Sequence, residues 1–280
     1  MAQLTIDEAL RGRELPAIEL RILLAYALDV DHAHLIAHGR DSFGDGARAQ
    51  FEALCARRIA GEPIAYLTGM REFYGVQFHV SPAVLIPRPE TEVLVDLALE
   101  RIPLDRIDRI LELGTGSGCI ALAIVMNRPL ARVTATEVSA AALAVARDNA
   151  RRLDADLEFR EGDWYAALGD ERFDIIVSNP PYVAAGDPHL MEGDLRFEPG
   201  TALCDGSDGL ASIRKIVAGA PAHLSAQGWL LVEHGYDQAA AARDLLTAAG
   251  FGMVRSWRDL AGIERVSGGQ VGKAISATGA

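Results

Sequence analysis

The sequence of 280 residues predicts an α/β protein in which a doubly wound, seven-stranded sheet follows a small helical domain. Three observations support this prediction. Apolar residues recur at helical spacing in the amino-terminal region, whereas helix-like and strand-like segments alternate over the rest of the chain. A glycine-rich turn joins the first strand of the alternating region to a helix, as in folds that bind a ligand at the edge of a sheet.

The amino-terminal region is predicted to be helical over residues 1–62, because its apolar side chains recur every three to four residues. Gly61-Glu62-Pro63 ends this pattern. Residues 73–80 then turn to aromatic and β-branched side chains with a period near two. We therefore expect residues 63–83 to form a β-hairpin that links two domains.

Residues 84–280 are predicted to form the α/β domain. The expected strands are 109–113, 132–137, 157–161, 173–178, 229–233, 251–257 and 263–267, and the expected helices are 90–101, 118–127, 140–153, 209–224 and 237–249. The last two strands follow each other without a helix, so they are expected to run antiparallel. Seven strands with such an ending are typical of a Rossmann-like methyltransferase more than of a dinucleotide dehydrogenase.

Composition excludes several classes of protein. Hydrophobic residues make up 50% of the chain and charged residues 24%, a balance typical of a globular protein. The longest apolar run, Cys119 to Met126, is too short to span a membrane, and residues 1–8 lack the pattern of a secretion signal. Three widely spaced cysteines favour neither a disulfide framework nor a metal site. We expect a cytoplasmic protein with no membrane partner and no bound metal.

The glycine-rich turn, Gly114-Thr115-Gly116-Ser117-Gly118, follows the strand predicted at residues 109–113. Glycines at such a turn let a ligand approach the main chain closely. Cys119 stands where a GxGxxG dinucleotide fingerprint has its third glycine. A nucleoside without a pyrophosphate, such as S-adenosylmethionine, is therefore favoured as the ligand. An ordinary strand-to-helix turn has the same glycines, so this loop alone does not decide the function.

Two further segments are candidates for contact with a nucleoside. Glu137 closes the second strand, 23 positions after Gly114, where a carboxylate accepts hydrogen bonds from both ribose hydroxyls. Asp163 and Trp164 follow the third strand and are candidates to hold the adenine, Asp163 by a polar contact and Trp164 by stacking. A solvated acid and a core tryptophan are the ordinary alternatives.

The tetrapeptide Asn179-Pro180-Pro181-Tyr182 directly follows a predicted strand, so it lies at the carboxyl edge of the sheet, where ligands bind. Two prolines fix φ and remove two main-chain donors, which leaves nearby carbonyls free to accept hydrogen bonds. The Asn179 side-chain oxygen and a nearby carbonyl can then accept both protons of a planar NH₂ group, while Tyr182 provides an aromatic wall. We expect Asn179, Pro180 and Tyr182 to be catalytic and the whole tetrapeptide to bind the acceptor.

The glycine loop and the NPPY tetrapeptide together resemble the amino-methyltransferases, which modify exocyclic adenine or cytosine nitrogens or glutamine side-chain amides. Narrower motifs resemble the peptide chain release factor glutamine methyltransferase family over residues 4–267, which implies a Rossmann-like class I methyltransferase domain. These motifs are Gly61-Glu62-Pro63-Ile64-Ala65-Tyr66-Leu67-Thr68-Gly69, Phe73-Tyr74-Gly75, Leu85-Ile86-Pro87-Arg88-Pro89-Glu90-Thr91-Glu92, Arg196-Phe197-Glu198-Pro199 and Glu264-Arg265-Val266.

The resemblance implies methyl transfer from S-adenosylmethionine to the glutamine of the GGQ motif in class 1 release factors, which leaves S-adenosylhomocysteine. By matching position, Gly114–Gly118, Glu137, Trp164 and Asn179 would hold the donor, and the NPPY tetrapeptide would hold the glutamine. The family often has Asp where this chain has Glu137, which is one methylene longer. We expect a monomer whose residues 1–62 recognise the release factor.

Methylation of an amide is expected to depend on positioning, because the nitrogen's lone pair is delocalised into the carbonyl. Hydrogen bonds to Asn179 and the Pro180 carbonyl would enrich the nitrogen and aim it at the methyl group. No strong base is then required. His79, His189 and His234 are expected to be hydrogen-bonded structural residues.

Other functions remain as alternatives. Methylation of a ribosomal-protein glutamine or of adenine in nucleic acid would use the same motifs, although the net charge of −12 counts against nucleic acid. The first 62 residues contain 7 Arg and no Lys against 10 Asp plus Glu, which favours a protein partner. A dinucleotide oxidoreductase would need the third glycine of the fingerprint, and a non-catalytic binding module would not need NPPY.

Gly268-Gly269-Gln270 repeats the tripeptide of the expected substrate within this chain. Coincidence is the favoured explanation in a glycine-rich sequence. The alternative is a mobile tail, from Ser267 to Ala280, that occupies the acceptor pocket of its own or a neighbouring molecule.

Overall fold

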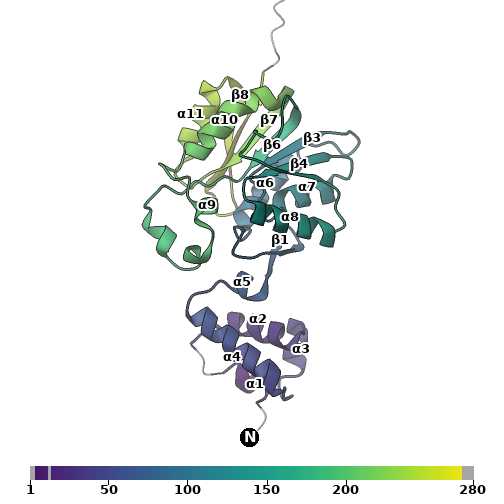
Figure 1. Ribbon diagram of the computed structural model, residues 1–280, viewed down its shortest axis with the longest axis vertical. Helices are drawn as coiled ribbons and strands as arrows, with labels where there is room; N and C mark the ends of the chain where they lie inside the picture. The colour runs from purple at the N-terminus through teal and green to yellow at the C-terminus, as the bar shows by residue number, and fades with distance from the viewer. Residues whose placement is uncertain (1–3, 12–13, 273–280) are drawn as a thin grey trace, which may run out of the picture. The chain divides into compact units, whose positions relative to one another are not determined.

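The computed structural model describes residues 4–11 and 14–272, which fall into two compact units (Figure 1). The helical unit comprises the chain up to Met70 together with Met191–Phe197. The sheet unit comprises Arg71–Leu190 and the chain from Glu198 onward. The segment of residues 191–197 is thus distant in sequence from the helices with which it packs.

The helical unit is built around two of its five helices, α2 and α4. The helices are α1 (Ile6–Ala9), α2 (Ala17–Leu28), α3 (His32–Ala37), α4 (Asp45–Ile59) and α5 (Ile64–Thr68). Leu23 and Leu24 of α2 are fully buried with Phe51 of α4 in one apolar cluster. Burial of each such side chain stabilises the unit by about 1.5–3 kcal/mol. The fold of this unit therefore follows from the helical spacing of its apolar residues.

A partly buried arginine ties the segment of residues 191–197 to these helices. Arg58 of α4 donates from Nε and Nη2 to the Glu19 carboxylate of α2, at 2.8 and 3.0 Å, and from Nη1 to Asp194 Oδ1 at 2.8 Å. The two acids hold the pKa of Arg58 above its usual range. Arg196 adds a hydrogen bond of 2.7 Å to the main-chain oxygen of Ala60. Charge-assisted hydrogen bonds of this kind are the stronger ones in proteins.

The stretch predicted as a hairpin over residues 63–83 begins with helix α5, so the secondary structure expected for its first residues was wrong. Pro63 presets φ at −59° directly before the helix, where a missing main-chain donor costs nothing. The hairpin itself consists of β1 (Met70–Phe73) and β2 (Val76–His79). Its two turn residues, at positions 74 and 75, both have positive φ, which matches the twist of the strands.

Besides the hairpin, the described residues of the sheet unit form a seven-stranded sheet in the order β5-β4-β3-β6-β7-β9-β8. These are β3 (Arg109–Leu113), β4 (Arg132–Glu137), β5 (Glu158–Glu161), β6 (Phe173–Ser178), β7 (Leu224–Glu233), β8 (Phe251–Arg258) and β9 (Glu264–Val271). The first five strands are parallel, whereas β9 runs antiparallel to both β7 and β8, as the sequence predicts. The carboxyl ends of β3, β4 and β6 meet because Leu113 lies opposite both Thr136 and Ser178.

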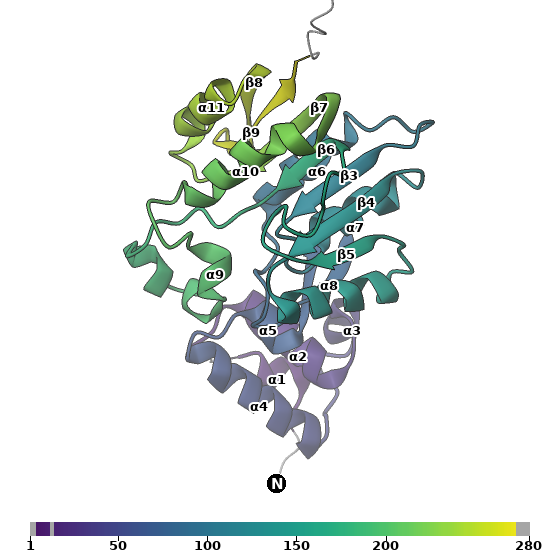
Figure 2. The same ribbon diagram turned by 45° about the horizontal axis from the view of Figure 1, so that its top comes forward.

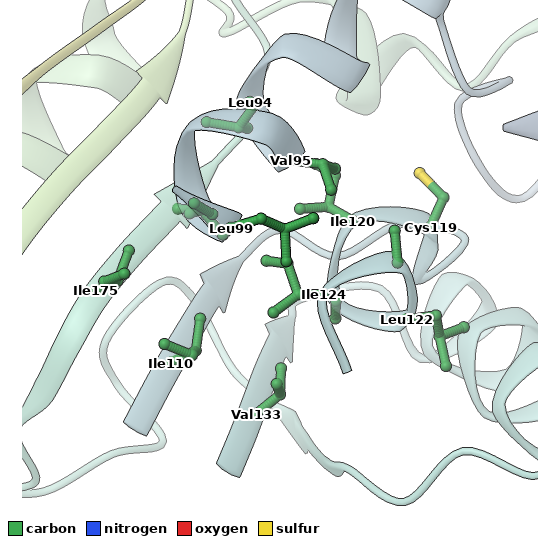
Figure 3. Close-up of a cluster of buried hydrophobic side chains, with 14 of the residues drawn as sticks. Leu94, Val95, Leu99, Ile110, Cys119, Ile120, Leu122, Ile124, Val133 and Ile175 are labelled. Carbon is green, nitrogen blue, oxygen red and sulfur yellow. The ribbon is translucent and has the colours of Figure 1, made fainter. Parts of the chain in front are cut away.

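Helices cover both faces of this sheet, which explains the continuous apolar character of its strands (Figure 2). From residue 89 onward, the helices of this unit are η1 (Pro89–Thr91), α6 (Glu92–Leu99), α7 (Cys119–Asn127), α8 (Ala140–Arg152), α9 (Gly200–Leu203), α10 (Ala211–His223) and α11 (Ala239–Ala248). The short turn η2 (Pro188–Met191) ends at the boundary of the unit, and the short turn η3 (Leu195–Phe197) belongs to the segment of residues 191–197. On one face, Leu94 of α6 and Ile124 of α7 pack over Ile110 of β3 (Figure 3). On the other face, Ile216 of α10 belongs to a cluster with Leu111, the next residue of β3.

The tripeptide Gly268-Gly269-Gln270 lies inside strand β9, so the expectation of a mobile tail from Ser267 was wrong for residues 267–271. Gly268 is paired with both neighbouring strands, and a Cβ atom there would lie 2.5 Å from the main-chain oxygen of Leu230. Gln270 donates from Nε2 to the main-chain oxygen of Gln227 at 2.8 Å. Both glycines thus have a packing role, which supports coincidence. Residues 273–280 lie outside the described residues.

Candidate active site

A cavity of about 280 Å³ lies at the carboxyl edge of the sheet, where the predicted motifs converge. All of its lining residues belong to the sheet unit. They are Ala83, Val84, Leu85, Pro87, Arg88, Thr91, Glu112, Gly114, Thr115, Gly116, Ser117, Cys119, Ile120, Glu137, Val138, Ser139, Ala142, Gly162, Asp163, Trp164, Asn179, Pro181, Pro199, Thr201 and Ala202. Of the expected site residues, Gly118, Pro180 and Tyr182 lie outside this lining.

The glycines of the loop adopt a backbone conformation that residues with side chains rarely adopt. Gly114, Gly116 and Gly118 have φ values of 72°, 55° and 83°, in the left-handed region that favours glycine. A Cβ atom at Gly118 would lie 3.2 Å from the Cβ of Ala146 in helix α8, so this glycine permits the close approach of α7 and α8. The predicted loop therefore forms a main-chain wall of the cavity.

Glu137 holds this loop from the end of β4. Its Oε2 accepts a hydrogen bond of 2.9 Å from the Gly116 amide, and its Oε1 accepts one of 3.0 Å from the Ser139 amide. The side chain is 9% exposed and lines the cavity. Each carboxylate oxygen can accept a second hydrogen bond. Glu137 therefore fixes the loop and keeps acceptor capacity for a ligand.

Glu112, at the start of the loop, also lines the cavity and was not among the predicted site residues. Its Oε2 accepts from the Thr115 hydroxyl at 2.5 Å and from the Ala121 amide at 3.1 Å. Its Oε1 is buried without a hydrogen-bond partner. Burial raises the pKa of this carboxyl to about 8. An acid within a buried strand was the signal in the sequence that could have identified it.

Asp163 and Trp164 line the cavity together with the glycine loop. The Trp164 ring packs beside Gly114, where a Cβ atom would lie 3.4 Å from ring atom Cζ3. Trp164 itself has a φ of 50°, an uncommon value for a bulky residue that occurs most often at functional sites. The indole is partly buried, packs against an apolar cluster of the sheet unit, and lines the cavity.

The NPPY tetrapeptide begins where β6 is anchored to β3, because the Ser178 hydroxyl donates to the Leu113 carbonyl at 2.8 Å. Asn179 lines the cavity, and its Nδ2 donates to the Thr91 hydroxyl oxygen at 3.2 Å. This bond leaves Oδ1 as the free acceptor of the Asn179 amide. Pro181 also lines the cavity, whereas burial raises the pKa of Tyr182 and keeps its phenol neutral.

The motif at residues 85–92 is held in place by Glu198, which belongs to a motif more than a hundred residues later. The Glu198 carboxylate is buried, accepts a hydrogen bond of 3.0 Å from the Ile86 amide, and forms an ion pair with Arg88. This connection places Arg88 and Thr91 at the cavity. Contacts between distant segments explain why the two motifs occur together.

Of the histidines near these segments, His189 and His234 have hydrogen-bonded side chains, whereas Nδ1 of His79 is buried without a hydrogen-bond partner. His234 is buried, its Nε2 pairs with the Ser267 hydroxyl at 2.8 Å, and burial lowers its pKa. Within residues 4–11 and 14–272, no cluster of His, Cys, Asp or Glu has the geometry of a metal site. In the same part of the chain, no helix combines the length and the apolar character needed to cross a bilayer.

Known proteins are similar to this chain in sequence and in fold. Residues 91–192 match the Methyltransferase small domain family, and residues 5–69 match the PrmC N-terminal domain. The chain is 56% identical over 274 residues to the release factor glutamine methyltransferase of Burkholderia pseudomallei, which covers 95% of this chain and 96% of that protein. This chain belongs to the release factor glutamine methyltransferase family. The resemblance stated from the motifs is thereby confirmed.

Two further relatives agree with this assignment. The release factor glutamine methyltransferase of Bordetella pertussis is 53% identical over 265 residues, or 94% of this chain and 98% of that protein. The crystal structure of a methyltransferase from Pyrococcus furiosus has a TM-score of 0.56 at 21% identity and covers 78% of this chain and 97% of that chain. The latter likeness concerns the fold alone, and it confirms the class I methyltransferase architecture.

Proposed function

We propose that this methyltransferase transfers a methyl group from S-adenosylmethionine to the side-chain amide nitrogen of the glutamine in the GGQ motif of class 1 release factors. The observation that carries the proposal is the orientation of Asn179. Its Nδ2 is committed to Thr91, so Oδ1 is the acceptor that the cavity offers beside the glycine loop. An acceptor is what an amide NH₂ group requires.

The cavity fits a nucleoside methyl donor. Gly114 and Gly116 supply main chain without side-chain bulk, and Glu137 keeps acceptor capacity suited to ribose hydroxyls. Asp163 and the half-buried Trp164 ring suit a purine, which stacks on aromatic faces. When bound, S-adenosylmethionine supplies an electrophilic methyl group on a sulfonium.

The chain's own residues would accelerate the transfer by positioning the acceptor. Asn179 Oδ1 and the Pro180 carbonyl would each accept one proton of the glutamine NH₂ group, which orients the nitrogen and enriches its electron density. Tyr182 lies outside the cavity lining and stays neutral, so it is proposed to support the tetrapeptide instead of contacting this nitrogen. The methylated amide is a strong acid while it retains its extra proton, so the Pro180 carbonyl or water suffices to remove it.

The helical unit is proposed to bind the folded release factor. On α2, Ile18, Ile22 and Tyr26 lie four residues apart and are 58%, 38% and 45% exposed, so they form an apolar stripe on one side of the helix. The surplus of acidic residues in this region opposes contact with phosphate backbones. We thus propose a protein partner, no nucleic-acid partner, and a monomer that works in the cytoplasm, where translation terminates.

A substrate panel tests the proposed function. The purified protein is incubated with labelled S-adenosylmethionine and, separately, a class 1 release factor, ribosomal proteins or DNA. We expect label in the release factor and its loss when the GGQ glutamine is replaced by alanine. Labelling of ribosomal protein or DNA, with an unlabelled release factor, would contradict the proposal.

A further inference from the structure

Catalysis by Asn179 requires that its amide presents oxygen and not nitrogen to the substrate. The structure contains one group that fixes this choice, because Nδ2 donates to Thr91 Oγ1 at 3.2 Å. A hydroxyl, however, can donate as well as accept. The orientation of the Asn179 amide is therefore fixed only if another group accepts a hydrogen bond from the Thr91 hydroxyl.

Glu233 is placed to accept this hydrogen bond. It follows Val232 in β7, which lies opposite Ser178 in β6, so Glu233 and Asn179 occupy equivalent positions at the ends of neighbouring strands. The Glu233 side chain is 1% exposed, and Thr91 is 2% exposed. The Oε2 atom of Glu233 is buried without a hydrogen-bond partner, so the Glu233 carboxyl has acceptor capacity that the fold does not use.

Several groups act on the Glu233 carboxyl from the surrounding elements. Burial raises its pKa to about 7, and the nearby charge of Glu90 in η1 acts in the same direction. The nearby Thr91 and Tyr182 hydroxyls and the charge of Arg265 in β9 lower the pKa and so favour the ionised form. The Cys119 thiol in α7 is also close enough to feel this charge, but burial raises its pKa to about 12, so it stays neutral.

We propose that Glu233 is a positioning residue that sets the orientation of the Asn179 amide through the hydroxyl of Thr91. The inference rests on the proposed function. Ionised Glu233 accepts a hydrogen bond from the Thr91 hydroxyl. The Thr91 oxygen can then only accept a hydrogen bond from Asn179 Nδ2, so Asn179 Oδ1 is directed to the substrate. Protonated Glu233 instead donates a hydrogen bond to the Thr91 oxygen. The Thr91 hydroxyl can then donate to Asn179 Oδ1, which favours the flipped orientation of the Asn179 amide.

The Tyr182 hydroxyl, at the other end of the tetrapeptide, also acts on the Glu233 carboxyl. One carboxyl on β7 is therefore near Thr91, the hydrogen-bond partner of Asn179, and near Tyr182. Glu233 does not line the cavity, so it acts through these neighbours and not on the substrate. The ionised state of Glu233 is the state in which both hydroxyls donate to it and both residues are fixed.

The test compares Glu233→Gln, Thr91→Val and Thr91→Ser with the wild-type enzyme. Controls are Asp108→Asn and Thr134→Val, which alter a buried acid and a buried threonine outside the cavity lining. Single-turnover rates, KM for the release factor and donor affinity are measured from pH 5.5 to 8.5. Thr91→Ser keeps the hydroxyl and is the conservative variant that should restore the rate.

We expect Glu233→Gln and Thr91→Val to lower the transfer rate about tenfold to a hundredfold, with donor affinity and KM changed less than about threefold. The wild-type rate should fall below about pH 7, where Glu233 becomes protonated, and Glu233→Gln should lose this acid limb. Thr91→Ser should retain the limb and most of the rate.

Two results would overturn the inference. One is a wild-type rate and acid limb in Glu233→Gln, and the other is an equal loss in Thr91→Ser and Thr91→Val. Unfolded variants are recognised by loss of donor binding together with rate. If the wild-type enzyme methylates no release factor, the proposed function fails first, and this outcome is distinct from a failure of the positioning role.

Discussion

Replacement of Asn179 by alanine separates the chemistry of the site from its ability to bind the donor. The substitution removes Oδ1, the acceptor of a side chain that lines the cavity, together with the 3.2 Å hydrogen bond to Thr91. Loss of one preorganised acceptor raises the barrier by about 3 kcal/mol, which lowers the rate about a hundredfold or more. The lost bond to Thr91 costs about 0.5–1.5 kcal/mol of folding stability, too little to unfold the protein.

Donor affinity should change by less than about threefold, because the glycine loop and Glu137 supply most of the proposed donor contacts. Calorimetry measures this affinity, and single-turnover assays with a release factor measure the transfer. Asn127→Ala is the matched control, since its Nδ2 only donates to the Ala123 carbonyl of its own helix, at 2.8 Å. Near wild-type transfer in Asn179→Ala, or a parallel collapse of donor binding, would refute the role assigned to Asn179.

Three further predictions concern other parts of the chain. Ile22→Ser with Tyr26→Ser should raise KM for the folded release factor about tenfold while donor affinity stays unchanged, and an unchanged KM in steady-state kinetics would remove α2 from the proposed contact. The raised pKa of Glu112 means that its folded form binds a proton between its unfolded pKa of 4.5 and about 8, so stability should fall as pH rises through this range. Denaturant titrations should show that Glu112→Gln loses part of this dependence, and an identical pH profile would show that the carboxyl is ionised in the fold. Gly268→Ala should lower the melting temperature by several degrees, because its Cβ would lie 2.5 Å from a main-chain oxygen, whereas Gly272→Ala has open space and should be neutral. Equal melting temperatures for these two variants would contradict the packing role of Gly268.

The sequence predicted the parallel strands well because their apolar character is local. Residues 109–113, 132–137 and 173–178 form strands with the predicted bounds. Strand β7 begins at Leu224 instead of the predicted residue 229. Its first part was missed because the register of its pairing with β6 is irregular there, and Gln227 in that part has a φ of 66°. Strand β9 continues to Val271 because two flanking strands satisfy its main chain, which no local pattern of small residues reveals.

The candidate site was predicted to the extent that its residues lie within contiguous motifs. The glycine loop, Glu137, the pair at residues 163–164, and Asn179 meet at one cavity. Glu112 and Thr91 line the same cavity and were not assigned a role, because their importance depends on burial and on partners far away in sequence. The role proposed for Glu233 depends on Thr91, which lies 142 positions earlier in the chain, and on the pairing of β6 with β7, which places Glu233 beside the strand end that carries Asn179.

The most direct test of the central claim is peptide mass spectrometry of a class 1 release factor after incubation with this protein and S-adenosylmethionine. We predict a single added methyl group on the side-chain amide of the GGQ glutamine, present with the wild-type enzyme and nearly absent with Asn179→Ala. An unmodified GGQ glutamine, or a methyl group elsewhere in the release factor, would contradict the account.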